Sequence, residues 1–174
     1  MVAKSQFANS ALTAAFAARA VDRAYLALAW GIPNPPAGDI EGAIGRDRRD
    51  RKRMAVVARN GKSARTYYRT LRTWGDALAL LECRLATGRT HQIRVHLAAI
   101  GHPVAGDATY GGPGLPGLMR HFLHAYRLRL RVPSTGEFVE LEAPLPPELD
   151  DVLKRLRGNS ATPVDPFPPH GEAP

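Results

Sequence analysis

TGRTHQIRVH, residues 87–96, is the stretch that decides how the rest of the chain is interpreted. Gly88 ends a strand pattern, and the apolar residues that follow predict a helix that runs to Gly101. Arg94 falls one turn after His91, on the same face of that helix. Because a guanidinium is permanently charged and presents a rigid fork of donors, Arg94 is suited to orient a carboxylate or a phosphate.

Further motifs lie on both sides of this segment, in a fixed order. They are DRAYLAL at 22–28, GKSART at 61–66, GHPVAGDATYGG at 101–112, FLHA at 122–125 and EAPLP at 142–146. In this order they closely resemble the motifs of the RluA/RluD-type RNA pseudouridine synthases. The resemblance covers residues 1–158.

The resemblance implies an enzyme that isomerises uridine to pseudouridine in structured RNA, with large-subunit ribosomal RNA favoured and transfer RNA as the alternative. A base inside a helix cannot react, so the target nucleotide must be flipped into a pocket. Tyr25 is implied as the tyrosine that stacks on the target base and as the candidate for C5 deprotonation. Arg94 is implied as the arginine that pairs with the catalytic aspartate. Neither a metal nor an organic cofactor is expected, and the spacing of His91 and His96 does not suit a metal pair on one helix face.

The catalytic aspartate of this family lies in an upstream His-Arg-Leu-Asp motif, which occurs nowhere in the 174 residues. The first four residues, MVAK, are similar to the end of the strand that follows that motif. Three explanations stay open. The start site is misassigned and the cell makes a longer, active enzyme; or the gene is truncated or split and leaves a catalytically inactive RNA-binding remnant; or the chain has been reused as a partner or scaffold.

The missing motif has two expected physical consequences. Without the catalytic aspartate, Arg94 would be an unmatched charge in a cleft, which is costly. Asp107 is expected to bond the local backbone of a turn rather than to replace the nucleophile. Since the family's missing strands belong to the same sheet, we also expect this N-terminally truncated chain to aggregate when it is expressed alone.

The chain is basic, with 24 Lys+Arg against 16 Asp+Glu and a formal net charge of +8. This balance suits counterion release from a phosphate backbone, although a merely basic protein would share it. The densest run, residues 46–53, is either a solvated loop or a phosphate-contacting loop, and the resemblance favours RNA contact. The expected RNA-binding residues are Arg46, Arg48, Arg49, Arg51, Lys52, Arg53, Lys62, Arg89, Thr90, His91 and Gln92. For Thr90 and Gln92, a structural capping role is equally compatible with the sequence.

The pattern of short strands and few helices predicts an α+β domain over residues 1–158, with a mixed, largely antiparallel sheet and few flanking helices. Asn60-Gly61 predicts a hairpin between strands at 54–58 and 64–74, and residues 134–136 predict another. An early helix with one buried face is expected to end near Asp22. The proline-rich residues 159–174 are expected to be a disordered tail.

A single cysteine, Cys83, excludes a disulfide scaffold and fits a reducing compartment. Its strand-like neighbours predict a buried structural thiol. The apolar stretch of residues 11–20 is too short to cross a bilayer and lacks the layout of a signal peptide. The sequence therefore favours a cytoplasmic, monomeric protein that binds RNA and has no membrane partner.

Overall fold

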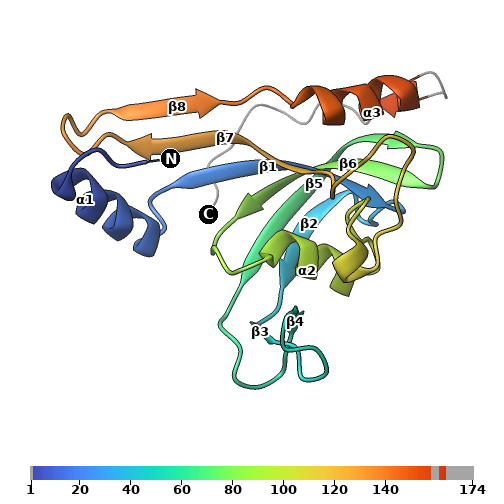
Figure 1. The fold of residues 1–174 in the computed structure, drawn as a ribbon, viewed down its shortest axis with the longest axis horizontal. Coiled ribbons are helices and arrows are strands. Elements are labelled where there is room, and N and C mark those ends of the chain that lie inside the picture. Colours follow the sequence, from blue (N-terminus) through green and yellow to red (C-terminus); the bar gives the residue numbers. More distant parts are fainter. Residues whose placement is uncertain (1, 158–160, 164–174) are drawn as a thin grey trace.

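The computed structural model describes residues 2–157 and 161–163. Within them the chain forms a large antiparallel sheet, a small two-stranded sheet and three α-helices (Figure 1). The helices are α1 (Gln6–Ala17), α2 (Gln92–Ala99) and α3 (Pro147–Arg157), and a short 3-10 helix, η1, spans Ala108–Tyr110. The strands are β1 (Asp22–Trp30), β2 (Ala37–Glu41), β3 (Ile44–Arg46), β4 (Met54–Val56), β5 (Arg65–Trp74), β6 (Leu78–Leu85), β7 (Leu123–Arg131), β8 (Phe138–Glu142) and β9 (Ala161–Pro163).

The large sheet runs in the order β2-β5-β6-β1-β7-β8, and every pairing within the described residues is antiparallel. The expected α+β class with a largely antiparallel sheet is therefore confirmed. The predicted hairpin of β7 and β8 is also present, with Gly136 at φ 72° in its turn. β9 pairs with β5 and falls inside the predicted tail; the rest of that tail lies outside the described residues, and the domain boundaries stay a prediction.

The hairpin predicted around Asn60-Gly61 is wrong. β4 pairs with β3 to form the small sheet, whereas β5 pairs with β2 and β6 in the large one. Asn60 does adopt the positive φ of a tight turn, at 61°. The local turn signal was correct, but tertiary partners decide which strands pair, because β5 gains a long ladder on both of its sides.

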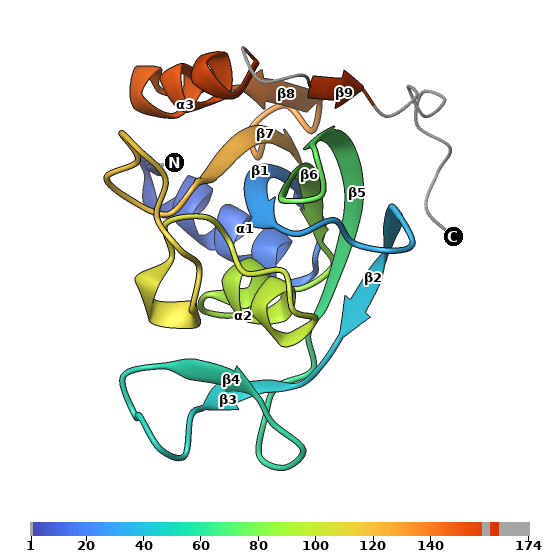
Figure 2. The same ribbon diagram turned by 90° about the vertical axis from the view of Figure 1, so that its right-hand side faces the viewer.

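Helices cover the two faces of the large sheet in different places, with α1 and α2 on one face and α3 on the other (Figure 2). On the α2 side, Ile93 and Leu97 pack against Ala27, Leu81 and Cys83 of the sheet. On the α3 side, a second cluster joins Leu28, Trp74, Leu78, Phe122, Leu149, Val152 and Leu153. Cys83 is fully buried, as predicted, and burial raises the pKa of its thiol to about 12.

Helix α1 forms as expected, with the side chain of Ser5 accepting a hydrogen bond from Ala8 N at 3.2 Å. The expected buried face is wrong, because α1 has no buried residue and Phe7 is 66% exposed. The helix also ends at Ala17 rather than near Asp22. Phe16 of α1 lines an open hollow over β1, β7 and β8, and its ring meets the Arg23 guanidinium, whose carbon lies 5.4 Å from the ring centre, rather than an apolar core.

Glu82 of β6 is a buried carboxylate, with 2% of its side chain exposed. It alternates with Cys83 and so points to the face opposite α2. The Tyr126 hydroxyl and Arg69 Nε both donate hydrogen bonds to it, and two further guanidiniums, of Arg84 and Arg127, lie at 3.7 and 3.8 Å. Burial would raise the pKa of Glu82, but the Tyr126 hydrogen bond and the arginines outweigh it and lower that pKa.

Among the described residues, no helix is long and apolar enough to cross a membrane.

Candidate active site

Arg94 lies on the first turn of α2 and pairs with Asp107, in the loop between α2 and η1. Arg94 Nε donates to Asp107 Oδ2 at 2.6 Å and Nη2 donates to Oδ1 at 2.7 Å. The two side chains are 11% and 1% exposed, so this is a two-point ion pair largely shielded from water. The expectation that Arg94 would be unmatched is wrong, since a carboxylate of this same chain meets it.

Asp107 was expected to bond the backbone of its own turn. It does so weakly, accepting from Tyr110 N at 3.4 Å, while its stronger contacts are those with Arg94. Burial would raise the pKa of Asp107, but the hydrogen bonds and charge of Arg94 outweigh it and lower that pKa. The carboxylate is thus ionised and committed to holding the arginine. Nη1 of Arg94 takes no part in the pair and can meet a second acceptor.

The residue before α2 has an unusual backbone. His91, at the N-cap position, adopts a left-handed conformation with φ 58°, and its side chain makes no capping hydrogen bond. Thr90 is exposed and does not occupy the cap position, so the capping role considered for it is wrong. The imidazole Nδ1 of His91 lies 2.9 Å from the Tyr110 hydroxyl. Burial and then the charge of Arg94 lower the pKa of His91, which favours the neutral ring.

Gln92 is 2% exposed and holds the loop that precedes α2. Its Oε1 accepts from Thr87 Oγ1 at 2.7 Å and from Arg89 N at 2.9 Å, and its Nε2 donates to Arg65 O at 2.9 Å and to Thr66 Oγ1 at 3.0 Å. Both ends of the amide are satisfied, which favours the structural role left open by the sequence. Arg89 uses Nε to donate to Ser63 O at 3.2 Å.

Tyr25 is half-buried in the middle of β1, where it pairs in register with Cys83 and Ala125. It packs against the same core cluster that holds Ile93 of α2. It also lines a hollow of ≈ 410 Å³ whose walls come from β7, β8 and Phe16 of α1. The Tyr25 ring thus lies at the edge of an open hollow.

The β3–β4 hairpin, residues 44–56, carries most of the predicted RNA-binding arginines. Arg46 at the end of β3 is exposed, as are Arg48, Arg49, Arg51 and Lys52 in the connecting turn, and Arg53 is half-buried. The hairpin lies beyond α2, on the side away from the large sheet (Figures 1 and 2). Lys62 is exposed nearby, at the isolated bridge to Ile44.

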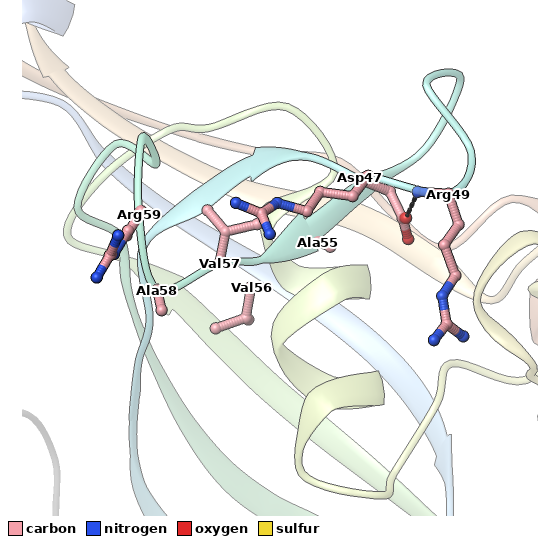
Figure 3. A pocket seen from close by; sticks show the side chains of 8 residues that line it. Asp47, Arg49, Ala55, Val56, Val57, Ala58 and Arg59 are labelled. Atoms are coloured by element: carbon pink, nitrogen blue, oxygen red, sulfur yellow. Dashed lines mark hydrogen bonds between the residues drawn. The ribbon is translucent and has the colours of Figure 1, made fainter.

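A hollow of ≈ 600 Å³ lies on this hairpin (Figure 3). Asp47 shapes one wall, because its Oδ1 accepts from Arg49 N at 2.7 Å and from Asp50 N at 3.3 Å. Arg48, Arg49 and Arg59 line it, over a floor formed by residues 55–58. Arg59 was missed in the sequence, although it directly precedes the Asn60-Gly61 turn beside the basic run.

Two further residues of the site were missed as functional candidates, Asp107 as the partner of Arg94 and Tyr110 as the partner of His91. Both belong to the GDATYGG segment, whose resemblance to a family motif was the available signal. The local turn pattern suggested only backbone hydrogen bonding, and it could not reveal a contact across 13 residues of sequence.

The family model described as RNA pseudouridylate synthase matches residues 1–99. The chain belongs to this family. It is 43% identical over 159 residues to the uncharacterized RNA pseudouridine synthase YlyB of Bacillus subtilis, covering 91% of this chain and 52% of that protein. It is 44% identical over 165 residues to the ribosomal large subunit pseudouridine synthase D of Nitrosomonas europaea, covering 90% and 47%.

The fold is likewise that of the family. The solved structure of human RNA pseudouridylate synthase domain containing 1 matches with a TM-score of 0.70 at 33% sequence identity, covering 95% of this chain and 76% of that chain. With respect to the two curated relatives, which are matched over 52% and 47% of their length, this chain spans about half of each. The matched portion contains the TGRTHQIRVH segment and its ion pair, which are the residues on which a functional proposal can be built.

Proposed function

We propose that this chain supplies the Tyr25 and Arg94 side of the active site of an RNA pseudouridine synthase, which isomerises uridine to pseudouridine within structured RNA. The observation that carries the proposal is the Arg94–Asp107 pair. This ion pair fixes Arg94 at the start of α2 and leaves its Nη1 free to bind an anionic partner. Because the chain belongs to the pseudouridine synthase family, that partner would be the catalytic carboxylate or a phosphate of the RNA.

The reaction breaks the C1′–N1 bond of uridine, turns the uracil and forms a C1′–C5 bond. A proton leaves C5 and N1 gains one, so the product is an isomer of the substrate. Tyr25 stacks on the detached uracil and takes the C5 proton. Arg94 orients the reacting carboxylate or the nearest phosphate through Nη1. The carboxylate that attacks is the aspartate of the family's His-Arg-Leu-Asp motif and not Asp107, because Arg94 already occupies both oxygens of Asp107.

RNA binding is the part of the proposal that needs no nucleophile. Exposed arginines of the β3–β4 hairpin contact phosphates and contribute affinity that is independent of sequence. This observation also supports the second candidate function, a catalytically inactive RNA-binding remnant. We favour large-subunit ribosomal RNA as substrate, because a relative 44% identical is named for it, with transfer RNA as the alternative. We further propose a monomer that acts in the cytoplasm.

The deciding experiment measures tritium release from structured RNA whose uridines are tritiated at C5. The protein from its native cells, identified by intact mass, is compared with the 174-residue chain. Tritium release by either protein supports the proposed synthase activity. In the protein that is active, Arg94→Gln should lower the rate of tritium release by about 100-fold or more. Arg131→Gln, at the last residue of β7 beside the β7–β8 turn, is the charge-matched control and should not lower the rate.

RNA affinity separates the two candidate functions. RNA binding with a steep salt dependence, but no tritium release by either the native protein or the 174-residue chain, would favour the inactive RNA-binding protein. Neither binding nor release would overturn both. Replacing one phosphate-contacting arginine of the hairpin should reduce the slope of log Kd against log salt by about 1.

A further inference from the structure

Tyr110 connects three segments that are far apart in the sequence. Its hydroxyl accepts a hydrogen bond from Met54 N at 3.1 Å, where β4 begins, and lies 2.9 Å from His91 Nδ1, where α2 begins. Its ring lies 4.8 Å from the guanidinium carbon of Arg94 and 5.2 Å from that of Arg53. One buried side chain thus contacts the basic hairpin, the helix entry and the arginine of the site.

The loop that presents Tyr110 is closely packed. Gly112 N donates to Asp107 O at 2.9 Å, and Gly106 N donates to Pro113 O at 2.8 Å. Gly111 adopts a positive φ of 82°, and a Cβ at Gly112 would lie 1.8 Å from Val104 O. The backbone on either side of Tyr110 is therefore held in one conformation, and the hydroxyl has a fixed place.

The hydroxyl can satisfy both of its polar neighbours at once. It accepts the Met54 N–H and donates its own hydrogen to His91 Nδ1 when that nitrogen is unprotonated. The lowered pKa of His91 favours the neutral ring, and in the neutral tautomer that carries its proton on Nε2 both bonds form together. The hairpin backbone and the entry of α2 are then joined through a single oxygen atom.

The remaining described contacts of the hairpin with the helix are mainly apolar. Ile44 and Met54 share a cluster with Val95 and Ala98 of α2, and such contacts fix no direction by themselves. The small sheet also has its own ladder, separate from that of the large sheet. The Tyr110 hydroxyl supplies a directional link between the strand that follows the basic turn and the start of α2.

We propose that Tyr110 is a positioning residue that fixes the β3–β4 hairpin relative to Arg94. RNA held by the basic turn then presents its target nucleotide to Arg94 and Tyr25 in one register. The inference rests on the proposed RNA binding. The GDATYGG segment then does more than form a turn. Asp107 orients Arg94, and Tyr110 fixes the position of the RNA-binding hairpin relative to Arg94.

The test uses Tyr110→Phe, which removes the hydroxyl and keeps the ring. Tyr68→Phe is the matched control, because Tyr68 is also buried and its hydroxyl donates a hydrogen bond, to Pro35 O at 3.1 Å. Binding of a fluorescent RNA stem-loop is measured by anisotropy, and exchange of the Met54 amide hydrogen is measured by NMR. Tyr110→Phe should weaken RNA affinity about fivefold and accelerate Met54 exchange, whereas Tyr68→Phe should do neither.

A double-mutant cycle separates positioning from a general loss of structure. In a chain whose exposed hairpin residues Arg46, Arg48, Arg49, Arg51 and Lys52 are all replaced by Gln, adding Tyr110→Phe should change affinity by less than about twofold, because the contacts that it positions are already lost. A fivefold loss in both backgrounds, or equal affinities of Tyr110→Phe and Tyr68→Phe, would overturn the inference and leave the proposed function standing. Failure of the unsubstituted chain to bind any RNA would instead count against the proposed function.

Discussion

Asp107 holds Arg94 from one side of the guanidinium, through hydrogen bonds of 2.6 and 2.7 Å to Nε and Nη2. Rotation about the terminal bonds of Arg94 would break both contacts, so the guanidinium is oriented without any ligand. An active site gains from such a contact, because a group held in place needs no reorganisation when the substrate arrives. The pair also fixes α2 against the loop that leads to η1.

The energy of this pair can be measured by replacing Arg94 with Lys and Asp107 with Asn, singly and together. Lysine cannot reproduce a two-point contact, and asparagine lacks the charge. We expect a coupling energy of about 2 kcal/mol from urea unfolding of the four proteins. Lys154→Gln, which breaks the exposed Lys154–Asp150 pair, serves as the control and should leave stability unchanged. Additive effects of the two substitutions would show that the pair contributes nothing.

The loop behind the pair should tolerate substitution very unevenly. Alanine at Gly112 would place its Cβ 1.8 Å from Val104 O, a backbone atom that cannot rotate away. Alanine at Gly114 would have no heavy atom within 4 Å. We expect Gly112→Ala to lower the free energy of unfolding by about 3 kcal/mol and Gly114→Ala to change it by about 1 kcal/mol or less. Similar melting temperatures for the two variants would contradict the close approach of these backbones.

The sequence predicted most strands and helices correctly because their patterns are local. The apolar run after Gly88 marked the helix that became α2, and the Ser134–Gly136 turn marked the hairpin of β7 and β8. What it missed depends on partners distant in sequence. β4 pairs back to β3 instead of crossing the Asn60-Gly61 turn, and no dipeptide signal encodes that choice. The partner of Arg94 was missed for the same reason, because turn chemistry explained Asp107 well enough by itself.

Residue roles were harder to predict than elements. Gln92 looked like part of an RNA-binding rim, but it is buried, and its four hydrogen bonds hold the loop before α2. A sequence gives the polarity of a side chain and not its exposure. α1 shows the converse, since its apolar residues predicted burial and the structure leaves Phe7 largely exposed.

Glu82 should be important for stability although it lies on the sheet face opposite α2. Its carboxylate receives hydrogen bonds from Tyr126 and Arg69 and is close to two more arginines. Glu82→Ala would leave these guanidiniums crowded and without their shared acceptor, so we expect a loss of about 3 kcal/mol in urea unfolding. Tyr126→Phe, which removes one donor and keeps the charges balanced, should cost about 1 kcal/mol. A smaller loss for Glu82→Ala than for Tyr126→Phe would show that the arginines do not need the carboxylate.

Stability should fall as the pH drops from 7.5 to 5.5, because three histidines have lowered pKa values in the folded state. Burial is the leading cause for His91, His96 and His121, and the charge of Arg94 also contributes at His91 and His121. The usual pKa of histidine is about 6.5. Above that pH these rings are neutral in both the folded and the unfolded state, and the full stability is present.

As the pH falls below that value, the unfolded chain binds protons that the folded chain refuses, and stability is lost progressively down through the folded-state pKa values. Melting temperatures at pH 7.5, 6.5 and 5.5 should therefore decrease, and His121→Gln should flatten the profile. The lowered pKa values of Asp107 and Glu82 act only below about pH 4, so their loss forms a separate, more acidic step. A melting temperature that is constant between pH 7.5 and 5.5 would mean that the folded protein leaves these rings as accessible to protons as the unfolded chain does.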